Sequence, residues 1–241
     1  DADCTVQAKW LESLNEAYYN GASMIVSPVQ FTGGSSFLAG LQTLDMFALQ
    51  GTGLGSLAWR MPAMNNGANL SYRKKDFLKV GGYDELRTPS GDDIFLMEKF
   101  QQEGFPIESN ISRKGVVFTP TEDNWSDFIQ QRIRWASKSG YYKNKWMIYL
   151  GFLVAVQQLF VLFFYVGALL VEKYWMELLF LLFCKWLIDF ILLFLVASFF
   201  KKKRSMFYFI PVQLIYPIYA IVIGIASLTV KYEWKGRSFN G

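Results

Sequence analysis

The sequence predicts an α/β fold followed by a membrane-embedded helical region. In residues 1–145, short apolar segments alternate with amphipathic ones, whereas residues 146–230 are dominated by long apolar runs. Alternating strands and helices are typical of α/β folds. Apolar runs of about 20 residues suit helices that cross a bilayer. We therefore divide the chain into two predicted domains, residues 1–145 and residues 146–241.

The charged residues are divided in the same way. Residues 146–241 carry nine Lys and Arg residues against four Asp and Glu residues, whereas residues 1–145 carry 15 against 16. The basic excess therefore belongs to the predicted membrane flanks, which argues against a nucleic-acid partner. With no His and only two Cys residues in the sequence, Ser-His and Cys-His catalytic pairs are excluded within it, and zinc is not expected. A bound metal would be held by oxygen atoms, as Mg²⁺ or Mn²⁺ prefers.

Hydrophobic periodicity predicts the elements of the first part in order. Apolar residues at helical spacing indicate helices within 5–20, 35–49, 90–104 and 124–140. Short apolar runs indicate strands at 23–31, 69–73 and 114–120. Gly21, Gly104 and the Gly81-Gly82 pair are expected to end elements, and Asn124 is expected to cap the last helix. The Gly-rich stretch "GTGLGS" (51–56) follows no strand, so we expect a flexible loop there and not a phosphate cradle.

Three apolar runs follow, over 146–171, 175–200 and 206–230. The basic segments before the first run and after the second, "KKKR" at 201–204, are both expected on the cytoplasmic side, which agrees with two crossings. A third crossing would place the basic C-terminal tail outside. Pro211 and Pro217 therefore suggest that the third run is broken into an interfacial or re-entrant piece, unless the charge rule fails here. We favour a cytoplasmic tail.

Lys185 and Asp189 lie four residues apart within the second run, so on a helix they share one face. Two interpretations stay open. The pair lines a polar path through the membrane, as ionisable intramembrane residues often do, or the two charges neutralise each other or reach toward the interface.

Three polar sites in the first part are candidates for chemistry: Asp1 with Asp3, Asp92 with Asp93, and the segment "QRIRW" at 131–135. Each has an ordinary alternative, since acidic pairs often cap helices and Arg and Trp are common beside membranes. Taken together, they supply carboxylates for a metal, a base for a hydroxyl, a guanidinium for phosphate and a flat ring for a sugar. Gln131, Arg134 and Trp135 are spaced to share one helix face.

This order of motifs resembles the membrane-bound family 2 glycosyltransferases, which include cellulose, hyaluronan and poly-N-acetylglucosamine synthases. The D-x-D at 1–3, the acidic pair in "GDD" at 91–93, Q-R-x-R-W and the apolar runs all follow the family's order, and 37 residues separate Asp93 from Gln131. "NGANLSYRKKDFLKVGGYDE" and the late "WKGR" also resemble family segments. "TED" at 121–123 is spelled like a family triplet but lies too close to Gln131, so we prefer Asp93 to Asp123.

The resemblance implies a GT-A (Rossmann-like) fold and an inverting, metal-dependent sugar transfer. It assigns Asp1 and Asp3 to Mg²⁺ or Mn²⁺, and Asp93 to the catalytic base. Gln131 and Arg134 would bind the diphosphate, and Trp135 with Asp92 would bind the acceptor.

The implied donor is a nucleotide-diphosphate sugar such as a UDP-sugar, and the implied acceptor is a glycan or a lipid-linked molecule. The protein is expected in the inner or plasma membrane with its catalytic part in the cytoplasm. Family members have further nucleotide-binding residues before D-x-D, so we expect this chain to be the C-terminal, acceptor-side half and to be inactive alone. A processive polysaccharide synthase, a non-processive lipid glycosyltransferase and a non-catalytic membrane subunit or channel all stay open.

Overall fold

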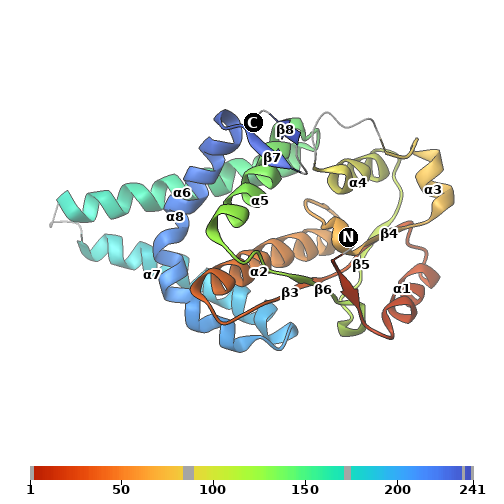
Figure 1. Ribbon diagram of the computed structural model, residues 1–241, viewed down its shortest axis with the longest axis horizontal. Helices are drawn as coiled ribbons and strands as arrows, with labels where there is room; N and C mark the ends of the chain where they lie inside the picture. Colours follow the sequence, from red (N-terminus) through yellow and green to blue (C-terminus); the bar gives the residue numbers. More distant parts are fainter. Residues whose placement is uncertain (1–2, 84–89, 171–174, 235–236, 240–241) are drawn as a thin grey trace.

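The computed structural model describes residues 3–83, 90–170, 175–234 and 237–239 (Figure 1). A mixed α/β part is followed by three long apolar helices, which confirms the predicted fold class. Figure 1 shows α6 running away from the α/β part and α7 running back toward it. The proposed division at Lys145 stays a prediction.

Two small sheets, each with a parallel pair of strands, form the β structure of the α/β part. In one, the order is β1-β6-β3, with β3 parallel and β1 antiparallel to β6. In the other, the order is β4-β2-β5, with β5 parallel and β4 antiparallel to β2. The C-terminal strands β7 and β8 form an antiparallel pair. The strand bounds are β1 Thr5–Val6, β2 Met24–Val26, β3 Val29–Thr32, β4 Leu70–Tyr72, β5 Ile107–Ser109, β6 Val117–Pro120, β7 Tyr232–Trp234 and β8 Arg237–Phe239.

The single strand predicted over 23–31 is wrong, because this segment forms two strands that belong to different sheets. Ser27 and Pro28 separate β2 from β3. The chain leaves one sheet at Val26 and enters the other at Val29, and both strands are buried. A continuous apolar run shows that a segment is buried, but it does not show which neighbours the segment pairs with.

Apart from α2, the helices of the α/β part end close to their predicted signals. Asn124 caps α5, its Oδ1 accepting the N–H of Asp127 at 2.9 Å. Gly21, Gly81, Gly82 and Gly104 all have positive φ, which glycine adopts without a steric penalty. The helix bounds are α1 Trp10–Tyr19, α2 Phe37–Ala58, α3 Lys74–Lys79, α4 Asp92–Gln102 and α5 Trp125–Ser137.

The flexible loop predicted for 51–56 is wrong, because this stretch is the C-terminal part of α2. Its glycines are explained by close packing. A Cβ on Gly51 would lie 3.0 Å from Leu192 of α7, and one on Gly53 would lie 3.0 Å from the Met64 carbonyl oxygen. Glycine is a poor helix former by about 1 kcal/mol relative to Ala. The close packing of α7 and of the segment at Met64 against α2 offsets that penalty.

The three apolar helices are α6 Lys145–Leu170, α7 Trp175–Phe199 and α8 Phe209–Thr229. Each belongs to a segment long and apolar enough to cross a membrane, namely Lys145–Gly167, Trp175–Phe199 and Lys203–Thr229. The length and apolar composition of these helices indicate an integral membrane protein. The short 3₁₀ helix η5, Lys203–Tyr208, joins α7 to α8.

Of the two alternatives for the third run, the structure does not show a break at proline, because α8 passes through Pro217 without interruption. A proline inside a helix leaves the carbonyl four residues earlier without its usual donor. Here that carbonyl belongs to Gln213, and the hydroxyl of Tyr165 on α6 donates to it at 3.2 Å. Pro211 lies in the first turn of α8, where no N–H is needed.

Lys185 and Asp189 form the predicted ion pair, with 2.7 Å between Nζ and Oδ2. The side chain of Gln213 completes the group, because its Oε1 accepts from Lys185 at 2.5 Å and its Nε2 donates to Asp189 at 2.8 Å. A carboxylate, an ammonium and an amide thus satisfy one another between α7 and α8. This arrangement favours mutual neutralisation over a polar path.

The helix α8 packs on the α/β part along its whole length. A buried apolar cluster includes Leu44 and Phe47 of α2, Phe128 of α5 and Val212 of α8. Near the other end of α8, Ile223 packs on Ile133 of α5. The strand β7, which follows α8, also contacts α5. Both ends of α8 therefore lie beside the α/β part, whereas α6 extends away from it and α7 returns to pack on α2 (Figure 1).

Candidate active site

A cavity of about 1190 Å³ lies between α2, α4, α5 and α8. It gathers the candidate residues that are far apart in the sequence. Asp1 lies outside the described residues. The other six candidates all line the cavity: Asp3, Asp92, Asp93, Gln131, Arg134 and Trp135.

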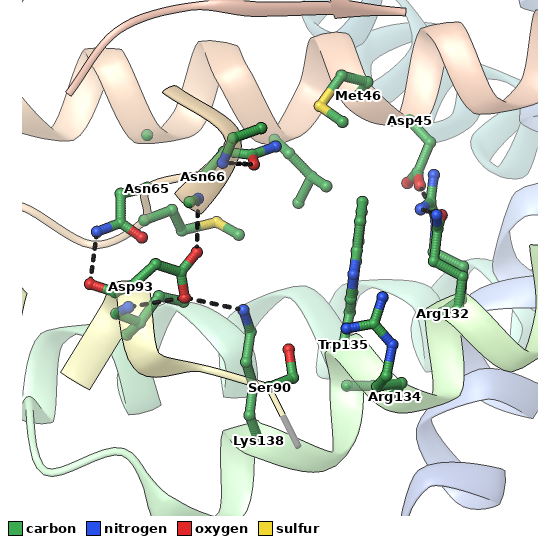
Figure 2. Close-up of a pocket in the computed structure, with 18 of the residues that line it drawn as sticks. Asp45, Met46, Asn65, Asn66, Ser90, Asp93, Arg132, Arg134, Trp135 and Lys138 are labelled. Atoms are coloured by element: carbon green, nitrogen blue, oxygen red, sulfur yellow. Dashed lines mark hydrogen bonds and ion pairs between the residues drawn. The ribbon is translucent and has the colours of Figure 1, made fainter. Parts of the chain in front are cut away.

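Asp93 is the second residue of α4, whose N-cap is Gly91 with a φ of 105° that only glycine adopts readily. Its Oδ2 accepts the N–H of Gly67 at 2.9 Å, and its Oδ1 lies 3.6 Å from the Lys138 ammonium. Asn65 donates to its backbone carbonyl at 2.8 Å. Figure 2 shows these contacts around Asp93, two to its carboxylate and one to its backbone carbonyl. They hold the Asp93 side chain in a fixed orientation.

The neighbouring acidic residues differ in their placement. Asp92 is exposed and lines the cavity. Asp123 is exposed and is not among the described residues that line it. Burial raises the pKa of the Tyr83 hydroxyl at the cavity rim, and the charges of Asp92 and Asp93 raise it further. Tyr83 therefore stays protonated at neutral pH, and its hydroxyl shares a 2.9 Å hydrogen bond with the Tyr72 hydroxyl.

Arg134 and Trp135 extend from α5 into the cavity side by side (Figure 2). Gln131 lines it as well, but its amide is engaged by protein groups at both ends. Its Nε2 donates to Glu122 Oε1 at 2.5 Å, and its Oε1 accepts from Arg132 at 2.6 Å. At most one Nε2 hydrogen remains for a ligand. Gln131 thus links Glu122 to Arg132 and helps to fix the wall of the cavity.

A buried ion pair behind this wall was missed by the sequence analysis. Arg132 Nε donates to Asp45 Oδ2 at 2.8 Å, and the two side chains are only 4% and 6% exposed. The Tyr216 hydroxyl of α8 donates to the other oxygen of Asp45 at 2.9 Å. The Arg132 guanidinium lies 4.3 Å from the centre of the Trp135 ring. This network joins α2, α5 and α8 and orients Trp135 toward the cavity.

A signal for this pair was present in the sequence. Asp45 is the one charged residue in the apolar helical stretch "SSFLAGLQTLDMFAL". Acidic residues are almost never fully buried without a partner. A lone Asp at such a position therefore predicts a buried cation elsewhere, although the stretch itself does not say which one.

Glu122 connects the "TED" segment to the cavity. Its backbone N–H and C=O are both bound by the side chain of Gln42 on α2, each at 2.9 Å. Burial raises the pKa of the Glu122 carboxyl, and the charge of Asp127 raises it further. Glu122 is thus the residue of "TED" that lines the cavity, where its carboxylate accepts a hydrogen bond from Gln131.

Replacing Glu122 with Gln is expected to change how folding stability depends on pH. A carboxyl whose pKa is higher in the folded state than in the unfolded state stabilises folding at acidic pH, and this contribution is lost as the pH rises through the raised pKa. A Glu carboxyl ordinarily has a pKa of 4.5, and that of Glu122 is raised above this value. From about this pH upward, the native protein should lose stability relative to Glu122→Gln. Thermal unfolding in detergent measures the difference, and a difference that is independent of pH would contradict the shift.

Of the two residues of the predicted metal site, Asp3 lies within the described residues and Asp1 does not. Its Oδ2 accepts from the Thr119 hydroxyl at 3.5 Å. Within the described ranges, no group of three Asp, Glu, Cys or His side chains is placed to hold a metal ion. Mg²⁺ is often bound by one or two carboxylates together with substrate phosphates. The single carboxylate of Asp3 fits a metal that also binds a diphosphate, and it does not fit a metal held by protein groups alone.

Comparison with known proteins identifies the family. Residues 1–225 match the family described as glycosyl transferase family group 2. The match covers the α/β part, α6, α7 and most of α8. No curated protein gives a significant match to the chain. Because the family match spans well over half of the sequence, the chain belongs to the family 2 glycosyltransferases, enzymes that transfer a sugar to an acceptor.

Proposed function

We propose that this chain carries the acceptor side of an inverting glycosyltransferase site at the cytoplasmic face of a membrane. The donor is a nucleotide-diphosphate sugar, with UDP-sugars as the first candidates. The observation that carries the proposal is the position of Asp93. Its carboxylate is fixed by Gly67 and Lys138 in the same cavity that Arg134 and Trp135 line.

In this proposal, Asp93 is the general base. It takes the proton of an acceptor hydroxyl while the hydroxyl oxygen attacks the anomeric carbon of the donor sugar. A bond forms between that oxygen and the anomeric carbon, and the bond from this carbon to the diphosphate breaks. The nucleoside diphosphate leaves with the bonding electron pair. The Lys138 ammonium, 3.6 Å from Asp93 Oδ1, helps to hold this carboxylate in position.

Arg134 is the proposed partner of the departing diphosphate. Its planar guanidinium suits phosphate oxygens, and negative charge develops there as the sugar leaves. Asp3, with Asp1 nearby in sequence, would hold Mg²⁺ or Mn²⁺, which supplies further neutralisation of that charge when bound. Gln131 orders this wall of the cavity through Glu122 and Arg132.

The acceptor is proposed to bind near Trp135 and Asp92. The far wall of the cavity is formed by α8, with Tyr219, Ala220 and Ile223 among the lining residues. A cavity wall made by an apolar helix suits an acceptor that is held at the membrane. A growing polysaccharide and a lipid-linked acceptor both meet this condition.

Analysis of the products tests the proposal and separates these acceptors. Membranes that contain the intact protein are incubated with radiolabelled UDP-sugars, and the products are separated by size. A ladder or polymer indicates a processive synthase, whereas a single addition to extractable lipid indicates a lipid glycosyltransferase. Membranes without the protein serve as the control. The absence of protein-dependent transfer from the nucleotide sugars would count against the proposal.

A further inference from the structure

A second cavity, of about 620 Å³, lies at the corner where α7 ends and η5 begins. It shares no lining residue with the cavity assigned to sugar transfer. Its lining is strongly basic, since five of its six residues carry a positive charge. The lining residues are Arg113, Ser198, Lys201, Lys202, Lys203 and Arg204.

The corner that carries these cations is fixed by its own packing. Phe200 is buried and stacks on Phe47 of α2, with 5.3 Å between the ring centres. Lys201 has a φ of 55°, a left-handed conformation that turns the chain sharply. Arg113, on the 3₁₀ helix η2 (Arg113–Gly115), donates to the Ser198 carbonyl at 3.1 Å. The α/β part and the end of α7 thus close around the cavity together.

The cavity lies at the expected level of the membrane surface on the side of the α/β part. α7 ends at Phe199, Phe200 follows, and the four basic residues begin at Lys201. The Lys203 ammonium lies 5.2 Å from the centre of the Phe194 ring of α7, a position typical of a cation at the edge of the apolar layer. Phe207 of η5 is 86% exposed. An exposed aromatic ring beside cations is typical of an interface with lipid.

Among the residues that the structure describes, no carboxylate balances the charges of this cavity. Within the described parts of the chain, no carboxylate forms an ion pair with any of these five cations, and none lines the cavity. Like charges held close together by a fixed corner repel one another, so an anion that enters the cavity is stabilised by all of them. Basic pockets beside membrane helices on the cytoplasmic side are suited to anionic lipid headgroups.

We propose that this cavity binds the phosphate of an anionic phospholipid headgroup and so docks the α/β part on an acidic membrane surface. The ligand chemistry is a phosphate ester, which a soluble phosphate also presents. The position at the end of α7 favours the lipid, because a headgroup is delivered there by the bilayer itself. The proposal does not depend on the assignment of the sugar-transfer site.

The test measures lipid binding to the detergent-purified intact protein. Native mass spectrometry and thermal unfolding are recorded during titration with phosphatidylglycerol, phosphatidylcholine or inorganic phosphate. We expect saturable binding and a raised unfolding temperature with phosphatidylglycerol only. The variant Lys201→Gln/Lys202→Gln/Arg204→Gln should bind phosphatidylglycerol about 10- to 100-fold more weakly. The control Lys74→Gln/Lys75→Gln removes two exposed lysines of α3 and should bind as the native protein does.

Two outcomes would overturn the proposal. One is undiminished phosphatidylglycerol binding by the triple variant. The other is an equal effect of inorganic phosphate, which would assign the cavity to a soluble anion. If the triple variant unfolds without lipid, the single variant Arg113→Gln removes one cation of the cavity from η2 and leaves the corner sequence intact. Its phosphatidylglycerol affinity should still fall, and native affinity there would also contradict the proposal.

Discussion

Replacing Asp93 with Asn is expected to lower the rate of sugar transfer by about 10²- to 10⁴-fold, the usual contribution of a general base. The amide cannot take the acceptor proton, but its oxygen can still accept the N–H of Gly67 that now binds Asp93 Oδ2. Donor binding should therefore be retained while kcat falls. Initial rates with the intact protein in membranes, together with separate donor-binding measurements, distinguish the two effects.

The control for this experiment is Asp123→Asn. Asp123 is exposed and belongs to the triplet whose spelling resembles a family motif. Its replacement should leave the transfer rate unchanged within about twofold, as is usual for a surface carboxylate with no role in proton transfer. Full activity of Asp93→Asn, or an equally large loss in Asp123→Asn, would show that Asp93 is not the base.

Replacing Asp45 with Ala is expected to destabilise the protein by about 3–5 kcal/mol, because the Arg132 cation is then buried without its partner. The Tyr216 hydroxyl loses its acceptor as well. The double variant Asp45→Leu/Arg132→Met removes both charges and should recover most of the lost stability. Denaturant unfolding of the purified protein measures each value.

The exposed ion pair between Lys114 and Glu12 provides a matched control. Its atoms lie 3.2 Å apart, but the side chains are 47% and 52% exposed. Glu12→Gln should therefore change the free energy of unfolding by no more than about 1 kcal/mol. A similarly small effect of Asp45→Ala would mean that the Asp45–Arg132 pair contributes little to stability. If the double variant does not recover stability, the two side chains contribute to the free energy of unfolding by more than the pairing of their charges.

Much of the fold could be predicted from local patterns. The caps and glycines that begin and end α1, α4 and α5 act within one turn of helix, and so do the periodicities that define these helices. The apolar runs of α6 and α7 are recognisable by length alone. The strands were harder to predict. β5 was not expected, and the 23–31 segment was taken as one strand, because strand pairing depends on residues that are distant in sequence.

The candidate site was predicted in part. The residues in "GDD" and "QRIRW" were chosen by their order and spacing, and they line one cavity. Asp45 and Glu122 were missed because each acts through a partner on another element. The roles of Asp93, Arg134 and Trp135 in transfer stay predictions until the variants are measured.

The sequence by itself determined the positions of the helices, the division between polar and apolar segments, and the family motifs, because each of these depends on residues close together in the chain. Only the tertiary structure decided how "GTGLGS" continues α2, how α8 continues through Pro217, and how Arg132 is neutralised. Gly51, Gln213 and Asp45 take these roles through contacts with α7, α6 and α5, respectively. A close approach, a freed carbonyl and a buried charge are each stabilised by a partner that the local sequence does not contain.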